Sequence, residues 1–213
     1  MATLEHSERP SLVGLVTTAR VLAILLFTIV EVAALTVWLA LLLEGSPTSG
    51  EALLGGGILV VGLAIEYVLT DLTVNGSDLA APSWTIVAFS LSEALLWSLW
   101  FAVANWATRP GGFVLAATVF AVTLVPQHTV VDNALRGVSP FARLLDLGTL
   151  GFTAVKATGA TVWLILVLRP VYLADWNSVE ALLGIQPFAV GFGVLALALF
   201  VEHTISVSYS RGR

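Results

Sequence analysis

The sequence predicts an all-α polytopic membrane protein with six transmembrane helices, arranged as three tandem helical hairpins in a pseudo-threefold internal repeat. Three observations lead to this fold class. Of the 213 residues, 58% are hydrophobic and only 11% are charged, whereas about 25% are charged in an ordinary soluble domain. The apolar residues gather in segments of about 20 or more, the length that crosses a hydrocarbon core of about 30 Å as a helix. One polar motif recurs in three of these segments.

The first apolar segment covers residues 20–43 and follows a polar stretch, residues 1–19. That stretch lacks the basic start and the small-residue cleavage site of a signal peptide, so we expect a cytoplasmic N-terminal segment followed by a retained helix. Five further segments, separated by the turn-forming stretches GSPTSG, NGSD, RPGG, RGVSP and LRP, span residues 55–75, 83–106, 112–135, 146–168 and 186–208. We expect one transmembrane domain over 20–209 and a short cytoplasmic tail, 210–213.

The loop before the last segment, YLADWNSVEALLGIQP, has the composition of a short interfacial helix, for which Trp176 and Leu182 are candidate anchors. Basic residues set the expected orientation of the chain. Positive-inside counting places both termini in the cytoplasm of a cell-membrane protein, because six arginines fall on one side of the predicted bundle and two on the other: Arg9, Arg20, Arg136, Arg143, Arg211 and Arg213 against Arg109 and Arg169.

Composition also excludes several functions. The formal net charge is −5 and no basic patch is present, which argues against nucleic acid as a partner. The absence of cysteine rules out disulfides and thiolate chemistry. Only one of the nine basic residues is lysine, an archaeal-like bias typical of halophilic, high-GC sources.

The recurring motif is F-[ST]-x-x-[EK]-x(4)-[ST]-x-W, which occurs at residues 27–38, 89–100 and 152–163. All three copies lie on odd-numbered segments. The even-numbered segments carry weaker counterparts, EYVLTD at 66–71, QHTVVD at 127–132 and EHTISV at 202–207. This spacing predicts three hairpins, at approximately 20–75, 83–135 and 146–208.

Helical geometry converts the motif into a spatial prediction. At about 100° per residue, the Phe, the first Ser/Thr, the Glu/Lys and the Trp share one face of each helix. If these faces point inward, Glu31, Glu93 and Lys156 converge at mid-depth beneath a layer of three tryptophans, with hydroxyl residues beside them: Trp38, Trp100 and Trp163, and Thr28, Ser90 and Thr153. The alternative is that the tryptophans form a belt against lipid headgroups. The second Ser/Thr faces elsewhere and is expected to bond its own backbone carbonyl.

The even-numbered segments add Glu66, Glu202, Gln127, His128 and His203 at similar depth. A charged group at the bilayer centre costs about 2.5–3.5 kcal/mol on insertion scales, so these groups have to be paired, protonated, hydrated or bound to a cation. Lys156 is the built-in counter-ion. Two aspartates complete the expected polar set: Asp132 follows His128 by one turn and is placed to orient its imidazole, and Asp71 follows Tyr67 in the same way.

These residues predict a membrane protein that handles a proton or a small cation, as a transporter or a channel, with the lipid bilayer as its environment and a homo-oligomer or membrane complex as a possible assembly. No cofactor is required by this interpretation. One alternative is a haem- or iron-binding redox protein, with His128, His203 and Glu202 as candidate ligands. A second alternative is a non-catalytic membrane subunit or a lipid- or pigment-binding scaffold. Hydrolase and nucleotide-binding motifs are absent, so an enzymatic role is the weaker expectation.

Overall fold

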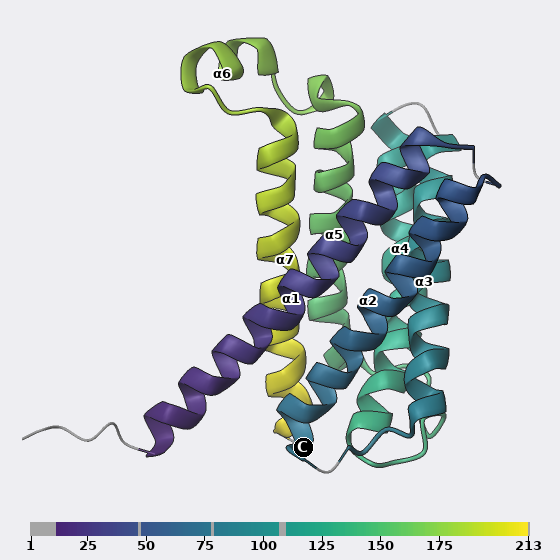
Figure 1. Cartoon of the computed structure of the whole chain (residues 1–213), viewed down its shortest axis with the longest axis vertical. Helices are drawn as coiled ribbons and strands as arrows, with labels where there is room; N and C mark the ends of the chain where they lie inside the picture. Colours follow the sequence, from purple (N-terminus) through teal and green to yellow (C-terminus); the bar gives the residue numbers. More distant parts are fainter. Residues whose placement is uncertain (1–11, 47, 78, 107–109, 213) are drawn as a thin grey trace, which may run out of the picture.

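The computed structural model describes residues 12–46, 48–77, 79–106 and 110–212. Within these ranges the regular secondary structure is helical throughout, and six helices are long and apolar enough to cross a membrane, which confirms the all-α polytopic fold class (Figure 1). The six are α1 (Leu12–Glu44), α2 (Gly50–Asn75), α3 (Ser83–Trp106), α4 (Pro110–Leu135), α5 (Leu147–Leu168) and α7 (Pro187–Arg211).

Two helices begin well before the apolar segments that predicted them. Helix α1 already begins at Leu12, whereas the apolar run was placed from residue 20, and the N-terminal stretch before Leu12 lies outside the described residues. Helix α2 begins at Gly50, five residues before the predicted start, because Ser49 caps it by accepting a hydrogen bond from the Ala52 amide at 3.2 Å. A charged residue is a poor marker of such ends, because Arg20 lies inside α1 and Glu51 lies in the first turn of α2.

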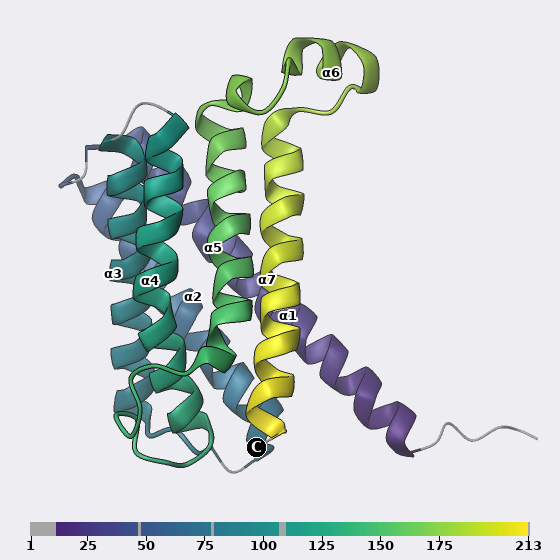
Figure 2. The ribbon, with the colours of Figure 1, turned by 180° about the vertical axis from the view of Figure 1, so that it is seen from behind.

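The predicted interfacial helix is present as α6 (Trp176–Leu183), which follows a 3-10 turn, η1 (Pro170–Tyr172). It stands off the end of the bundle between α5 and α7 (Figures 1 and 2). Of its two expected anchors, Leu182 is 82% exposed and Trp176 is half-buried. The helix ends at Gly184, whose φ of 66° is the left-handed conformation that glycine adopts without steric cost.

The six long helices form a closed ring. Each packs against its neighbours in chain order, and α7 also packs against α1. Helices α2, α4 and α7 additionally contact one another across the ring. We call the end of the bundle that carries the start of α1 and the end of α7 the terminal face, and the opposite end the α6 face (Figure 2). Large apolar side chains cover the outside, among them Leu53, Leu95 and Leu197 at 64–72% exposure, as a bilayer-embedded surface requires.

Small residues let the backbones of two hairpins approach closely. A Cβ placed on Gly62 of α2 would lie 2.3 Å from the Cβ of Ala34, and one on Gly159 of α5 would lie 2.1 Å from the Cβ of Ala198 on α7. Small residues serve this role in membrane helix pairs, where close van der Waals packing replaces the hydrophobic effect.

The Gly62→Ala variant is expected to lower the stability of the folded protein by about 1–3 kcal/mol, the usual cost of overpacking. Thermal unfolding in detergent measures it. Gly56→Ala is the matched control, because nothing lies within 4 Å of a Cβ at that position, and the added methyl should stabilise the helix slightly. Adding Ala34→Gly to Gly62→Ala should restore stability; equal unfolding temperatures for the two single variants would contradict this packing.

The motif tryptophans line the interior of the bundle. Trp38, Trp100 and Trp163 are at most 2% exposed, so the alternative interpretation of a headgroup belt is wrong. The second Ser/Thr of each motif copy donates to its own helix, as expected: Thr36, Ser98 and Thr161 bond the carbonyls four residues earlier at 2.7–2.8 Å. The inward faces of the three motif helices are therefore the ones that helical geometry predicts.

Candidate functional site

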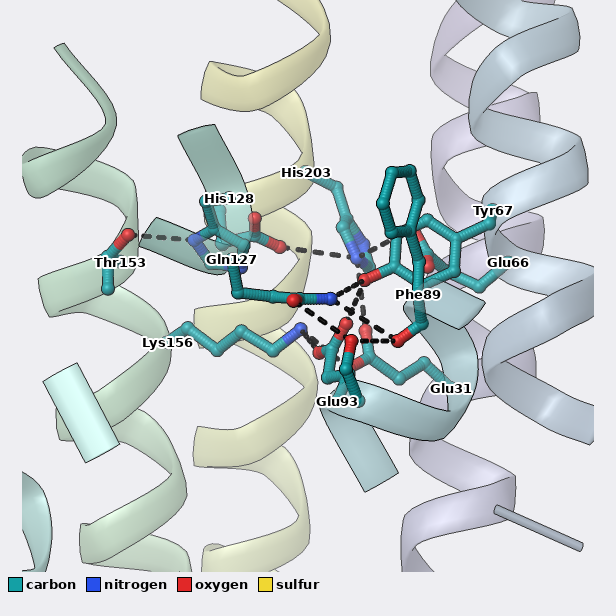
Figure 3. Close-up of polar contacts among 12 residues, drawn as sticks. Glu31, Glu66, Tyr67, Phe89, Glu93, Gln127, His128, Thr153, Lys156 and His203 are labelled. Atoms are coloured by element: carbon teal, nitrogen blue, oxygen red, sulfur yellow. Dashed lines mark hydrogen bonds and ion pairs between the residues drawn. The ribbon is translucent and has the colours of Figure 1, made fainter. Parts of the chain in front are cut away.

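Lys156 joins the two motif glutamates in the middle of the bundle. Its Nζ atom lies 2.9 Å from Glu31 Oε1 and 2.5 Å from Glu93 Oε1, and all three residues are at most 3% exposed (Figure 3). The three side chains come from α1, α3 and α5, as the repeat predicted. Buried ions need this mutual contact, because removing one partner leaves an uncompensated charge in a medium of low dielectric constant.

His203 of α7 provides the second positive centre. Its Nδ1 lies 2.9 Å from the hydroxyl of Thr28, and this hydroxyl donates its hydrogen to the Ile24 carbonyl, so Nδ1 carries the proton of the shared bond. Its Nε2 lies 3.0 Å from Glu31 Oε2 and 3.2 Å from Glu202 Oε2. Both ring nitrogens therefore face acceptors, which favours the imidazolium form.

The Thr28→Val variant is expected to destabilise the fold by about 1–3 kcal/mol, because the shape is kept while a buried donor loses its acceptor. Unfolding in detergent, monitored by circular dichroism, measures the change. Thr204→Val is the control, since Thr204 also donates to its own helix, at the Phe200 carbonyl, but lies exposed on the outer face of α7. Equal losses in the two variants would mean that the contact with His203 contributes nothing.

Glu93 and Glu31 are thus both compensated. Glu93 accepts from Lys156 through one oxygen and from the Tyr67 hydroxyl through the other. Glu31 lies between Lys156 and His203. The carboxylates of Glu31 and Glu93, the Lys156 ammonium and the His203 imidazolium together carry no net charge.

Glu66 and Glu202 remain as surplus carboxylates. They are 6% and 3% exposed. Glu66 accepts from Thr70 at 2.9 Å and stands 3.7 Å from His203 Nε2, which Glu202 approaches at 3.2 Å. Since Lys156 and His203 already balance Glu31 and Glu93, the further basic group that lines the cavity beside this second pair is the His128 imidazole, which cannot match two full negative charges. Glu66 and Glu202 are therefore the groups that a proton or another cation has to neutralise.

His128 of α4 sits beside this cluster with its Nδ1 at 2.7 Å from the Thr153 hydroxyl, which in turn donates to the Thr149 carbonyl. The same arrangement of histidine, hydroxyl and backbone carbonyl holds His203 at Thr28. The prediction that Asp132 orients the His128 imidazole is wrong. Asp132 instead accepts from Ser210 and pairs with Arg136, each at 2.7 Å, because α7 brings a hydroxyl to the end of α4.

Asp71 also lies away from the cluster. It is fully buried at the terminal end of α2, where it accepts from the backbone amides of Ala80 and Ala81 at 3.2 and 2.9 Å and from Asn75 at 2.7 Å. These contacts fix the connection between α2 and α3. The two aspartates expected to support the histidine and tyrosine thus tie helix ends together.

Gln127 and Ser90 contribute less directly. The Gln127 amide accepts from Ser92 at 2.9 Å and donates to the Phe89 carbonyl at 3.2 Å, which joins α4 to α3, and it approaches the Tyr67 hydroxyl at 3.5 Å. Ser90 donates to the Ile86 carbonyl, in the way that the other two motif hydroxyls donate to their own helices. Both positions support the elements that carry Glu93.

Two residues of the site were not among the candidates. Tyr67 donates to Glu93, and its repeat position, equivalent to those of His128 and His203, was the available signal. Trp97 is fully buried, with its ring centroid 5.8 Å from Lys156 Nζ, a cation–π contact on the α6 side of the ammonium. It follows Glu93 by one helical turn, which places it on the same face.

A small cavity adjoins the cluster. It offers about 30 Å³ to the centres of water-sized molecules, room for about two waters. Glu66, Glu202, His128, His203 and Lys156 line it on one side; Thr70, Val131, Leu135, Ser206 and Val207 continue it toward the terminal face. Among the described residues no three His, Asp or Glu side chains are placed to hold a metal ion.

No protein-family model, curated protein or solved structure matches this chain. The candidate site therefore rests on its own geometry.

Proposed function

We propose that this integral membrane protein handles protons or a small cation at the cluster formed by Glu31, Glu66, Glu93, Lys156, Glu202 and His203. One observation carries the proposal: two carboxylates, Glu66 and Glu202, are buried beside a water-sized cavity, while the two cations of the cluster, Lys156 and His203, are already balanced by Glu31 and Glu93. Intramembrane ionisable groups are costly and mark ion paths and proton relays.

The arrangement divides into a fixed and an exchangeable part. Glu31, Glu93 and Lys156 form the fixed part, because every ionised group in it has a partner within 2.9 Å. Glu66 and Glu202 form the exchangeable part, with His203 between the two. An ion or proton that binds there supplies the positive charge that these two carboxylates lack. The positive charge of the His203 imidazolium repels it and so favours its release.

The two hydroxyl-held histidines and the paired glycines support a threefold repeat of hairpins around this site. A Cβ on Gly55 would meet the Trp38 carbonyl at 3.2 Å, and one on Gly191 would meet the Trp163 carbonyl at 3.3 Å, positions that correspond in the first and third hairpins. Sites at repeat interfaces near mid-membrane are common in transporters.

We place the protein in the cell membrane with the terminal face in the cytoplasm, because more arginines lie on that side of the bundle than on the other.

The haem alternative fits the geometry poorly. The Nε2 atom of His203 already lies within 3.7 Å of three carboxylates, and the adjoining cavity has space for about two water molecules rather than for a macrocycle. The scaffold alternative leaves the surplus carboxylates unexplained. A Soret band in the purified protein would favour haem binding over the handling of protons or cations.

Reconstitution into liposomes tests the proposal. Under an imposed membrane potential, proteoliposomes should show proton or cation flux above that of protein-free liposomes of the same lipid. If imposed gradients of protons, Na⁺, K⁺ and Mg²⁺ all persist as long as in protein-free liposomes, transport is excluded.

A further inference from the structure

The cluster is closed on one side by aromatic residues. On the α6 side of Lys156, Trp97 packs edge-on against Trp100, with 5.3 Å between ring centroids, and in a tilted arrangement against Phe120, with 4.7 Å between centroids. The next residues toward the α6 face, Leu59 and Leu195, are also completely buried. The Thr161 hydroxyl is bonded within this layer, where it accepts from Trp100 Nε1 at 3.2 Å, and none of the layer's residues named here lines the cavity at the cluster. The cavity therefore does not extend toward the α6 face.

The other side of the cluster has a mixed lining, in which Thr70 and Ser206 are polar and Val131, Leu135 and Val207 are apolar. The cavity at the cluster shares Leu135 with a second cavity of about 410 Å³ at the terminal face. The lining residues of the two lie on successive turns of the same helices: Thr70 and Val74 on α2, Val131 and Leu135 on α4, Ser206 and Ser210 on α7. The second cavity is therefore a vestibule in front of the first, with Leu135 between them.

The vestibule is lined by two guanidinium groups. Arg136 is paired with Asp132, while Arg211 donates to the Thr73 carbonyl at 3.1 Å and makes no ion pair within the described part of the chain. Asp132 neutralises Arg136, and the remaining charge of Arg211 repels a hydronium ion as it repels a metal cation, so the size of the inner cavity is what distinguishes protons from metal ions. The inner cavity holds about two waters, whereas Ca²⁺ takes six to eight oxygen ligands and Mg²⁺ about six, several of them waters.

We infer that protons are the ion of this site and that, in the conformation of this structure, they reach Glu66 and Glu202 only from the terminal face, through the vestibule and past Leu135. Release to the α6 face, which net flux requires, then needs a second conformation in which the aromatic layer opens. The inference rests on the proposed function for the identity of the ion, but the access path stands on the two cavities and the aromatic layer alone. Water in the inner cavity connects the carboxylates to the vestibule, and Leu135 sets how often that connection is made.

Cysteine accessibility tests the path, and the absence of native cysteine removes any background. Ser206→Cys, in the inner cavity, should react with a membrane-impermeant thiol reagent added at the terminal face and not with reagent added at the α6 face. Thr204→Cys is the matched control on the lipid-facing side of α7 and should stay unmodified from either face. Gly212→Cys and Glu180→Cys report which face the reagent reaches.

The gate is tested in the same assay. Adding Leu135→Ala to Ser206→Cys should speed the modification from the terminal face several-fold, and Leu135→Trp should slow it. Modification of Ser206→Cys from the α6 face, or its absence from both faces even with Leu135→Ala, overturns the path. The circular dichroism spectrum of each variant verifies that it is folded.

Ion identity is tested separately in proteoliposomes. A pH gradient should drive flux, whereas gradients of Na⁺, K⁺ or Mg²⁺ at constant pH should not, and metal-ion flux overturns the assignment of protons. The two failures are distinguishable. Labelling from the terminal face without any ion flux contradicts the proposed function and leaves the access path intact. Ion flux together with labelling from the α6 face contradicts the access path and leaves the proposed function intact.

Discussion

Lys156→Met is expected to destabilise the folded protein by about 3–5 kcal/mol, the usual result of removing one partner from a buried ion pair. Methionine matches the lysine stem in length, so packing is largely kept. The loss comes from Glu31 and Glu93, whose oxygens lie 2.9 and 2.5 Å from the ammonium and are left without it. Thermal unfolding in detergent and the yield of folded protein both measure the effect.

Charge compensation gives this prediction its control. The double variant Lys156→Met with Glu93→Gln removes one charge of each sign and should recover most of the lost stability. Arg169→Met, at an exposed position near the α6 face, should change stability by no more than about 0.5 kcal/mol. If Lys156→Met unfolds at the wild-type temperature, the ion pair contributes nothing to the fold.

Glu202→Gln and Glu66→Gln should each lower the rate of proton flux in proteoliposomes by roughly 100-fold, the lower end of what a positioned proton acceptor contributes to a transfer step. Glutamine keeps the shape but cannot take up a proton. The side chains lie within 3.2 and 3.7 Å of His203 Nε2, and no third surplus carboxylate replaces them within the described residues.

Stability separates this effect from misfolding. Both substitutions replace a buried carboxyl group that has to be neutralised by an uncharged amide of the same shape, so the variants should unfold at or above the wild-type temperature. Glu44→Gln and Glu180→Gln, at exposed positions, are the matched controls and should transport at the wild-type rate. Flux that survives in the double variant Glu66→Gln with Glu202→Gln would remove both residues from the path.

The convergence of Glu31, Glu93 and Lys156 could be predicted because it depends on quantities that the sequence fixes. The rotation of about 100° and the rise of about 1.5 Å per residue are properties of any α-helix, and the spacing of the motif placed its polar residue on the face of the tryptophan. Inward orientation then followed from the cost of exposing a charge to lipid. The same reasoning gave six helices from apolar length alone.

The partners of individual side chains could not be predicted in this way. The sequence predicts that Asp132 contacts His128 on its own helix. In the structure Asp132 instead accepts a hydrogen bond from Ser210 of α7, which is 78 residues away in the chain. Thr153 then holds the imidazole. Such choices depend on the relative rotation and height of packed helices, which one helix's periodicity does not determine. The burial of Trp97 over Lys156 has the same origin.

The infrared spectrum of the reconstituted protein tests most directly whether Glu66 and Glu202 carry exchangeable protons. In the wild type, the carbonyl stretch of a protonated carboxyl group should be present at neutral pH and shift on transfer to D₂O, because the cavity of about 30 Å³ admits water from the terminal face. The double variant Glu66→Gln with Glu202→Gln should lose that band, and Glu44→Gln with Glu180→Gln should keep it. A band that is absent from the wild type, or that persists in the double variant at the cluster, would contradict the account.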